Sequence, residues 1–251
     1  MRIQLINPNT CQGMTDKIAL CAEHIALPTT QVTACSPQHG PETIECARDE
    51  VLASAGLLDV IKECEQEPNK PDAYIVACFG DPALDAAKEL TEAPVLGIAQ
   101  AAFHAASLVS YRFSVVTTLA RTIPTAEHLL QRYGLAERCC AIRAIELPVM
   151  ALEQTDNATF QQLLAACRET LHYDGAEAIV LGCAGMSDLV SDLQSELGVP
   201  VIDGVTAAVS LAESLHRLSL STSKVATYAP PPAKPFTGRY QHWSAVAGKE
   251  D

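Results

Sequence analysis

Two cysteines occupy the same place in two similar stretches of the sequence. Cys78 ends the apolar run of AYIVACFGDPAL (residues 73–84), and Cys183 ends the apolar run of AIVLGCAGMSDL (residues 178–189). In each stretch a strand-length run leads into the cysteine, a glycine-containing turn and the start of a helix. The cysteines are 183 − 78 = 105 residues apart, which is enough for each to belong to its own α/β unit. We therefore predict that two units face each other and that the thiols meet across a cleft.

Cysteines in such positions are suited to proton transfer. A helix dipole and free backbone N–H groups stabilise a thiolate, so its pKa can fall from about 8.5 toward neutral. One thiolate would then be a base, and a protonated thiol on the other face of a flat substrate would be an acid. Charge left on a neighbouring carbonyl would be stabilised by backbone N–H groups of the Phe79-Gly80 and Ala184-Gly185 turns. Such a pair would racemise or epimerise a substrate without a cofactor.

Each candidate residue also has an ordinary structural use. Most reduced cysteines are small apolar core residues, and we expect this of the other eight, which include Cys21, Cys64, Cys139, Cys140 and Cys167. Asn7 and Asn9 also suit a turn, and Asp81-Pro82 suits the first turn of a helix. Thr117 and Thr118 are also typical of a strand end. The Gly40-Pro41 loop is expected to be structural unless it folds over the cleft.

The elements that would position these residues alternate between strand and helix. Apolar runs predict strands at residues 2–6, 31–35, 73–77, 93–98, 112–116, 141–145, 178–183 and 200–205. Apolar periodicity predicts helices at residues 17–26, about 51–61, 81–90, 99–109, 124–133, 157–173 and 205–218, with Thr10 or Thr15 capping the first. This alternation predicts the α/β class, with parallel sheets and right-handed crossovers.

The chain repeats its plan. RFSVVTTLA at Arg112 aligns with RIQLINPNT at Arg2, an offset of 112 − 2 = 110, so Thr117 and Thr118 take the places of Asn7 and Pro8. We infer an internal duplication. Ligands of parallel α/β sheets bind at the carboxyl ends of the strands. This rule predicts a shared face for residues 7–10, 78–82, 117–118 and 183–186.

Composition excludes several classes of protein. The 251 residues carry a net charge of −13, which argues against a nucleic-acid surface. No run approaches the roughly 20 apolar residues of a membrane span, and the N-terminus does not read as a signal peptide, so we expect a cytoplasmic protein with reduced thiols. No CxxC, HExxH or close His/Cys cluster occurs, so no metal site is predicted. The tail beyond Leu220, which contains three consecutive prolines, is expected to be an extended arm.

Several motifs in order resemble the aspartate/glutamate/hydantoin racemase superfamily, and most closely its hydantoin and allantoin racemase branch. They are INPNT at Ile6, GPETIE at Gly40, ACFGDPAL at Ala77, VTTLARTIP at Val116, LGCAGMSDL at Leu181 and PVIDGV at Pro200. The glutamate racemase branch would instead show a DSG-type first loop, an ACNT-like first cysteine turn and an LGCTH-like second one. Amino-acid racemisation is therefore the less favoured reading.

The resemblance implies two pseudo-symmetric parallel-sheet α/β domains with the active site in the cleft between them. We expect the first domain at residues 1–98 plus 205–251 and the second at 99–204. It also implies a cofactor-independent two-base mechanism, with Cys78 and Cys183 on opposite faces of the ring carbon of a hydantoin, allantoin being the first choice. The residues implied to hold the ring are Asn9, Phe79, Gly80, Thr117, Thr118, Gly182 and Ala184. Arg121 is expected to be structural, and a homo-oligomer is implied.

Other functions remain open at this stage. They include racemisation of other 5-substituted hydantoins or of aspartate or glutamate. Arylmalonate decarboxylase-like and maleate isomerase-like enzymes share the fold and use cysteine, although the decarboxylase type needs just one. A small-molecule binding protein is the non-enzyme alternative, and the sequence shows neither the export signal nor the DNA-binding appendage that would normally accompany one.

Overall fold

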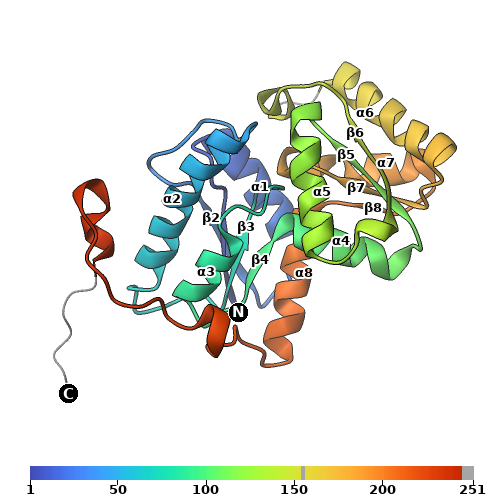
Figure 1. Ribbon diagram of the computed structural model, residues 1–251. Coiled ribbons are helices and arrows are strands. Elements are labelled where there is room, and N and C mark those ends of the chain that lie inside the picture. Colours follow the sequence, from blue (N-terminus) through green and yellow to red (C-terminus); the bar gives the residue numbers. More distant parts are fainter. Residues whose placement is uncertain (154–155, 245–251) are drawn as a thin grey trace.

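The computed structural model, which describes residues 1–153 and 156–244, contains two four-stranded parallel sheets (Figure 1). The first sheet has the order β2-β1-β3-β4, formed by β1 (Arg2–Ile6), β2 (Gln31–Cys35), β3 (Ala73–Val76) and β4 (Val95–Gly97). The second has the equivalent order β6-β5-β7-β8, formed by β5 (Phe113–Thr117), β6 (Cys139–Ala144), β7 (Ala178–Leu181) and β8 (Val201–Ile202). The same strand order in both halves confirms the predicted fold class.

Eight α-helices connect and cover the strands in the described part of the chain. They are α1 (Gln12–Ile25), α2 (Ala47–Cys64), α3 (Leu84–Leu90), α4 (Ile98–Val109), α5 (Ile123–Arg132), α6 (Asn157–Glu169), α7 (Val190–Leu197) and α8 (Gly204–Arg217). Helices α4 and α8 pack against each other between the two halves (Figure 1). None of the described helices is long and apolar enough to span a bilayer.

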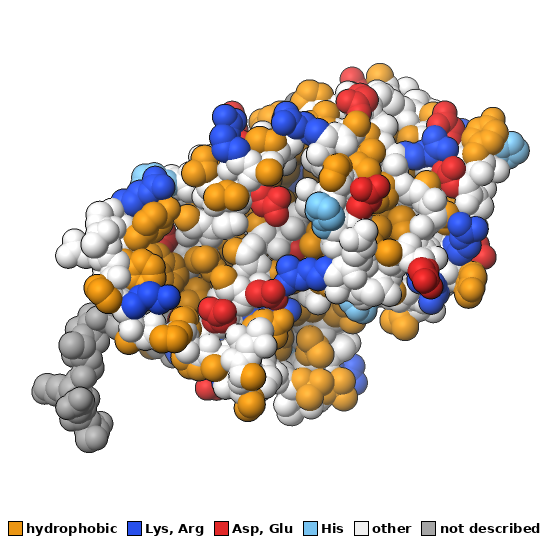
Figure 2. Space-filling model, in the orientation of Figure 1, with side chains coloured by type: hydrophobic (Ala, Val, Ile, Leu, Met, Phe, Trp, Pro, Cys, Tyr) orange, Lys and Arg blue, Asp and Glu red, His pale blue; other side chains and the backbone are white. Residues whose placement is uncertain are grey.

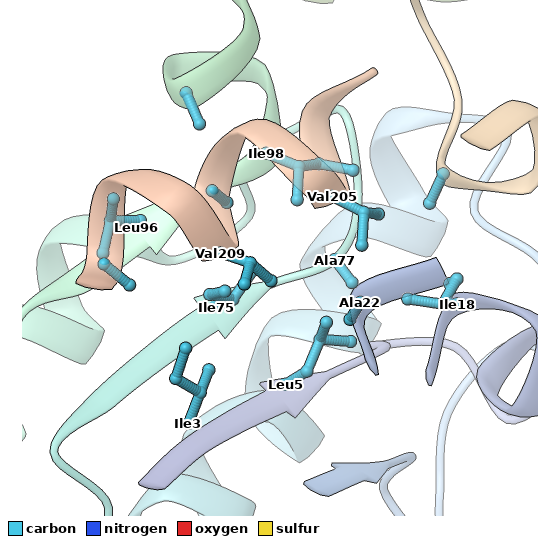
Figure 3. Packing of buried hydrophobic residues seen from close by; sticks show 14 of the residues in the cluster. Ile3, Leu5, Ile18, Ala22, Ile75, Ala77, Leu96, Ile98, Val205 and Val209 are labelled. Atoms are coloured by element: carbon cyan, nitrogen blue, oxygen red, sulfur yellow. The ribbon is translucent and has the colours of Figure 1, made fainter. Parts of the chain in front are cut away.

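The inner strands β1 and β3 of the first sheet have helices packed on both faces, and alternate residues of each strand point to opposite sides. On one side Ile3, Leu5 and Ile75 meet α1 and α8, whose contributions include Ile18, Ala22, Val205 and Val209 (Figure 3). On the other side Ile6, Tyr74 and Val76 pack with Leu57 and Ile61 of α2 and with Leu84 of α3. The apolar strand runs seen in the sequence are the consequence of this two-sided burial.

Helix α4 belongs to the cores of both halves. Its Ile98 and Ala101 pack in the cluster of the first sheet, whereas Phe103 and Ala106 pack with Phe113 in the cluster of the second. The remaining face of the second sheet packs against α6 and α7. The domain boundaries at residues 98–99 and 204–205 stay a prediction, with α4 the element that the two halves share.

Three local predictions were wrong. Helix α1 begins at Gln12, and neither Thr10 nor Thr15 caps it, because Thr10 binds the Pro41 carbonyl and the Thr15 hydroxyl donates to the Cys11 carbonyl within the helix. The helix expected from Asp81 begins at Leu84, since Asp81 and Ala83 have positive φ angles of 45° and 52°. The helix expected to reach Tyr173 ends at Glu169 and continues as one π turn, Thr170–Asp174.

The tail beyond Leu220 has few residues of regular structure. Its described part, up to residue 244, forms two short 3₁₀ turns, Ala226–Tyr228 and Gly238–Trp243, and otherwise runs extended along the first half (Figure 1), while the last seven residues of the predicted arm lie outside the described residues. The Tyr228 hydroxyl donates to Asp85, and the Trp243 indole N–H donates to Asp59 of α2. The arm is therefore held on the first half by polar contacts and aromatic side chains.

Candidate active site

A cavity of about 530 Å³ lies between the two halves, at the carboxyl ends of β1, β3, β5 and β7. All nine residues predicted for the site line it: Asn9, Cys78, Phe79, Gly80, Thr117, Thr118, Gly182, Cys183 and Ala184. Figure 2 shows acidic, basic and histidine side chains along the middle of one face of the molecule, where the two halves of Figure 1 meet. Residues that are up to 175 positions apart in the sequence (184 − 9 = 175) are thus brought to one place.

The two cysteines sit in equivalent turns. The Cys78 carbonyl accepts from the Asp81 N–H at 3.0 Å, and the Cys183 carbonyl accepts from the Met186 N–H at 3.2 Å. Both side chains are partly buried. In each turn the residue two positions after the cysteine is a glycine, Gly80 or Gly185. Its backbone N–H points to the thiol sulfur. The duplicated sequence therefore gives duplicated thiol sites.

The expectation of a lowered thiol pKa was wrong. Burial raises the pKa of Cys78 to about 12 and the pKa of Cys183 to about 11, and the Gly80 and Gly185 N–H groups oppose this only in part. A helix dipole acts within about one turn of the helix end. Helix α3 begins at Leu84, six residues beyond Cys78, whereas a 3₁₀ helix, Ala184–Leu189, begins directly after Cys183 and leads into α7. Burial therefore favours the protonated form of both thiols.

Thr117 and Gly182 bring β5 and β7 close together below the cavity. The Thr117 hydroxyl donates to the Gly182 carbonyl at 3.3 Å, and a Cβ on residue 182 would lie 2.8 Å from the Thr117 Cβ. Only glycine fits at this approach. The Thr118 hydroxyl, in contrast, makes no hydrogen bond with any described residue, so it is free to bind a ligand.

Asn9 presents its amide nitrogen to the cavity. Its Oδ1 accepts from the Asn7 side chain at 2.8 Å and from the Cys11 N–H at 2.9 Å. Because a backbone N–H can only donate, this network fixes which end of the amide carries the oxygen. The Asn9 Nδ2 group donates to no described residue and is available for a carbonyl. Asn7, which was predicted to lie on this face and also suited a turn, both orients Asn9 and lines the cavity.

The turn after Cys78 is anchored in the second half of the molecule. The Phe79 ring packs edge-on against Phe103 of α4 with centroids 5.4 Å apart, so Phe79 faces the cavity mainly with its backbone. The Asp81 carboxylate accepts from the Ala99 N–H at 3.0 Å, the Gln100 N–H at 2.8 Å and the Tyr133 hydroxyl at 2.7 Å. Burial raises the pKa of Asp81 to about 6, against the effect of these three donors. Asp81 therefore links the Cys78 turn to α4 and α5.

Sequence reasoning missed one wall of the cavity. Ile44, Glu45, Cys46 and Glu50, from the loop after Gly40 and the start of α2, line it. The loop crosses to the other half, where Glu45 accepts from the Val149 N–H at 2.9 Å. The GPETIE motif was the available signal, since the resemblance already included it.

Several further side chains differ from the expectation. Cys46 is not a core residue, because it lines the cavity and its thiol donates to Asp49. Of the eight cysteines assigned to the core, only Cys11 and Cys167 are buried. Arg121, expected to be structural, lines the cavity and is exposed. His128 and Arg132 of α5 also line the cavity and are exposed. No group of three or more His, Cys, Asp or Glu side chains within residues 1–153 and 156–244 is placed to hold a metal ion.

Comparison with known proteins identifies the family to which this constellation belongs. The family model described as Asp/Glu/Hydantoin racemase matches residues 3–212. The chain belongs to this family. A hydantoin racemase of Rhizobium meliloti is 47% identical over 95% of this chain and 98% of its own length, and one of Paenarthrobacter aurescens is 44% identical over 94% and 100%. The structure of an allantoin racemase from Klebsiella pneumoniae has a TM-score of 0.94 and 46% identity, covering 98% of this chain and 99% of that chain.

These relatives confirm the resemblance seen in the motifs, including its hydantoin and allantoin racemase branch. The protein is thus a racemase, which is an isomerase, and its substrate is a small molecule. The cavity described above is the place in this racemase where two thiols, a free amide and a free hydroxyl converge.

Proposed function

We propose that this racemase inverts the substituted ring carbon of allantoin by proton transfer between Cys78 and Cys183, without a cofactor. The observation that carries the proposal is that both thiols line one cavity in equivalent turns, one from each half of the molecule. Because the two thiols come from different halves of the molecule, they are suited to act as an acid and a base on opposite faces of a flat ring.

The proposed reaction is a balanced exchange of one proton. The thiolate removes the proton from the ring carbon, and the electron pair passes to the adjacent carbonyl as an enolate. The other thiol then returns a proton to the same carbon from the opposite face, so the two cysteines have exchanged protonation states after each turnover. N–H groups of the two cysteine turns would stabilise the negative charge that develops on this oxygen.

The surrounding charges favour Cys183 as the more acidic of the two thiols. Lys17 of α1 lowers the pKa of Cys183, whereas the Glu50 carboxylate raises the pKa of Cys78. Glu45 raises that of Cys183 more weakly than Lys17 lowers it. We therefore propose that Cys183 becomes the thiolate base more readily than Cys78.

The free polar groups suit a neutral ring. The Asn9 amide N–H₂ and the Thr118 hydroxyl can bind ring carbonyl and N–H groups, with the backbone of Phe79, Gly80 and Ala184 beside them. Thr117 and Gly182 would act by holding the cavity floor, since their hydroxyl and carbonyl are bonded to each other. A ring carrying amides and no carboxylate needs no buried cation, and the lining arginines, Arg121 and Arg132, are exposed.

Other 5-substituted hydantoins are the second candidate substrates. The hydantoin racemase of Rhizobium meliloti and the allantoin racemase of Klebsiella pneumoniae are almost equally identical to this chain, at 47% and 46%. Met14, Ile44 and Leu129 also give the cavity an apolar part that would take a hydrocarbon substituent. The cytoplasmic location, inferred from the sequence, and the homo-oligomer, implied by the resemblance, both stay proposals.

Proton exchange at the ring carbon tests this function directly. Purified protein is given enantiopure allantoin or a 5-substituted hydantoin in deuterated water, and the ring C–H signal and the optical rotation are followed. We expect both to decay much faster than with the Cys78→Ser, Cys183→Ser double variant, because a serine hydroxyl is too weak a base near neutral pH. We expect each single variant to lose racemisation while keeping its circular dichroism spectrum. Full turnover by either single variant would rule out the two-cysteine mechanism.

A further inference from the structure

One carboxylate in the cavity has no partner. Glu50 lies in the first turn of α2, lines the cavity and is partly buried. Its carboxylate accepts no hydrogen bond from, and forms no ion pair with, any side chain or backbone group of residues 1–153 and 156–244. Its acidic neighbours differ in this respect, since Glu45 accepts from the Val149 N–H and Asp49 accepts from the Glu45 N–H and from Cys46.

The Glu50 carboxylate lies beside the Cys78 turn. A Cβ built on Gly80 would be 3.6 Å from the Glu50 carboxyl carbon and from one of its oxygens. Among the acidic groups that raise the pKa of the Cys78 thiol, Glu50 has the largest effect. The carboxylate thus faces the place where the ring carbon, with its substituent, has to lie for Cys78 to reach it.

A partly buried carboxylate without donors is costly, because burial removes water that it would otherwise bind. Burial accordingly raises the pKa of Glu50. A ligand that donated hydrogen bonds to both oxygens would remove this cost. A ureido group, –NH–CO–NH₂, has two parallel N–H bonds at the spacing of the two carboxylate oxygens, and it can therefore bind in a bidentate manner.

We propose that Glu50 selects substrates whose ring substituent presents a pair of N–H donors, as the ureido group of allantoin does. This inference rests on the proposed function and adds the residue that distinguishes allantoin from hydrocarbon-substituted hydantoins. A hydrocarbon substituent of the same shape would leave the Glu50 carboxylate desolvated and unpaired, and sites with unpaired polar groups reject such analogues strongly.

The test compares two substrates of nearly the same shape. Allantoin carries the ureido group, and 5-isobutylhydantoin carries a branched hydrocarbon of similar size with no donor. The ratio of kcat/KM for allantoin to that for 5-isobutylhydantoin is measured for the wild-type protein, for Glu50→Gln and for Asp49→Asn. Asp49→Asn is the matched control, because it removes the same charge one residue away and Asp49 does not line the cavity.

We expect Glu50→Gln to lower the ratio at least tenfold, through a loss for allantoin with little loss or a gain for 5-isobutylhydantoin. We expect Asp49→Asn to leave the ratio unchanged. Equal losses for both substrates in Glu50→Gln would overturn the selectivity role and indicate that Glu50 acts only on the Cys78 thiol or on the fold. Absence of racemisation of either compound by the wild-type protein would instead refute the proposed function, so the two failures are distinguishable.

Discussion

The N-terminus of α4 is capped by the carboxylate of Asp81, a residue of the Cys78 turn, and not by a residue at the cap position of α4 itself. Transferring the carboxylate from residue 81 to that cap position by mutation tests how the Cys78 turn is held. Gly97 occupies the cap position of α4, and the Asp81 carboxylate binds the Ala99 and Gln100 N–H groups in its place. In the second half Asp203 caps α8 itself, binding the N–H groups of Val205 and Thr206. The duplicated halves differ at this point.

Removing the Asp81 carboxylate by Asp81→Ala leaves three donors, two backbone N–H groups and the Tyr133 hydroxyl, without their partner. A hydrogen bond to a charged group contributes about 1.5–3 kcal/mol, and an unpaired buried donor costs about 1–3 kcal/mol. Water can reach part of Gln100 and Tyr133, which are only partly buried, so the full sum does not apply. We expect the free energy of unfolding to fall by about 3–5 kcal/mol at neutral pH.

A second substitution, Gly97→Asp, should return the cap. Residue 97 has an extended backbone with φ −88° and ψ 147°, which suits an aspartate at a cap position. In the wild-type protein its Cβ would lie 2.2 Å from Asp81, so Gly97→Asp alone should destabilise the fold. In the Asp81→Ala, Gly97→Asp double variant the new carboxylate can bind the Ala99 and Gln100 N–H groups, and we expect about 1–2 kcal/mol to be recovered.

The assay is urea unfolding followed by circular dichroism, together with racemase activity. Asp203→Ala serves as the control, because it removes the cap of α8 without touching the Cys78 turn. We expect Asp81→Ala to lower kcat more than Asp203→Ala does at a comparable loss of stability. A double variant no more stable than Asp81→Ala would refute the assignment of Asp81 as the cap of α4.

Two further predictions concern pH. Burial raises the pKa values of Cys183 and Cys78 to about 11 and about 12, so the thiolate fraction grows with pH. We therefore expect kcat/KM to rise by up to about tenfold per pH unit from neutral pH. A kcat/KM profile that is flat between pH 7 and pH 9 would contradict raised thiol pKa values in the unliganded site. The pKa of Asp81 is raised from 3.8 to about 6 in the folded protein, so the stability that the folded protein gains by binding this proton is complete below the lower value and is lost as pH rises through the higher one. Between these two pKa values the wild-type protein should therefore lose about 3 kcal/mol of unfolding free energy relative to Asp81→Asn. Urea unfolding of both proteins at several pH values measures this difference, and no change with pH would mean that Asp81 titrates normally.

Much of this protein could be predicted from local sequence patterns. Apolar runs of strand length, each followed by a turn and a helix, predicted the α/β class, and the repeat of AYIVAC in AIVLGC singled out Cys78 and Cys183 from ten cysteines. These features are local because the run that forms a buried parallel strand is apolar on both faces, and because the strand end fixes where the next residue points. Motif order then identified the family.

Tertiary structure decided what the chemical groups of the site can do. The thiol pKa values are raised because segments remote in sequence remove water from Cys78 and Cys183, and no local pattern reports that burial. Asp81 caps α4, rather than its own helix, because Gly97 leaves room for its carboxylate. The free donor of Asn9 and the unpartnered carboxylate of Glu50 are likewise defined by which groups the fold brings near them and which it does not. The sequence by itself determined the strand ends that carry the thiols, whereas hydrogen bonding and desolvation, which depend on neighbours far along the chain, were decided only by the folded protein.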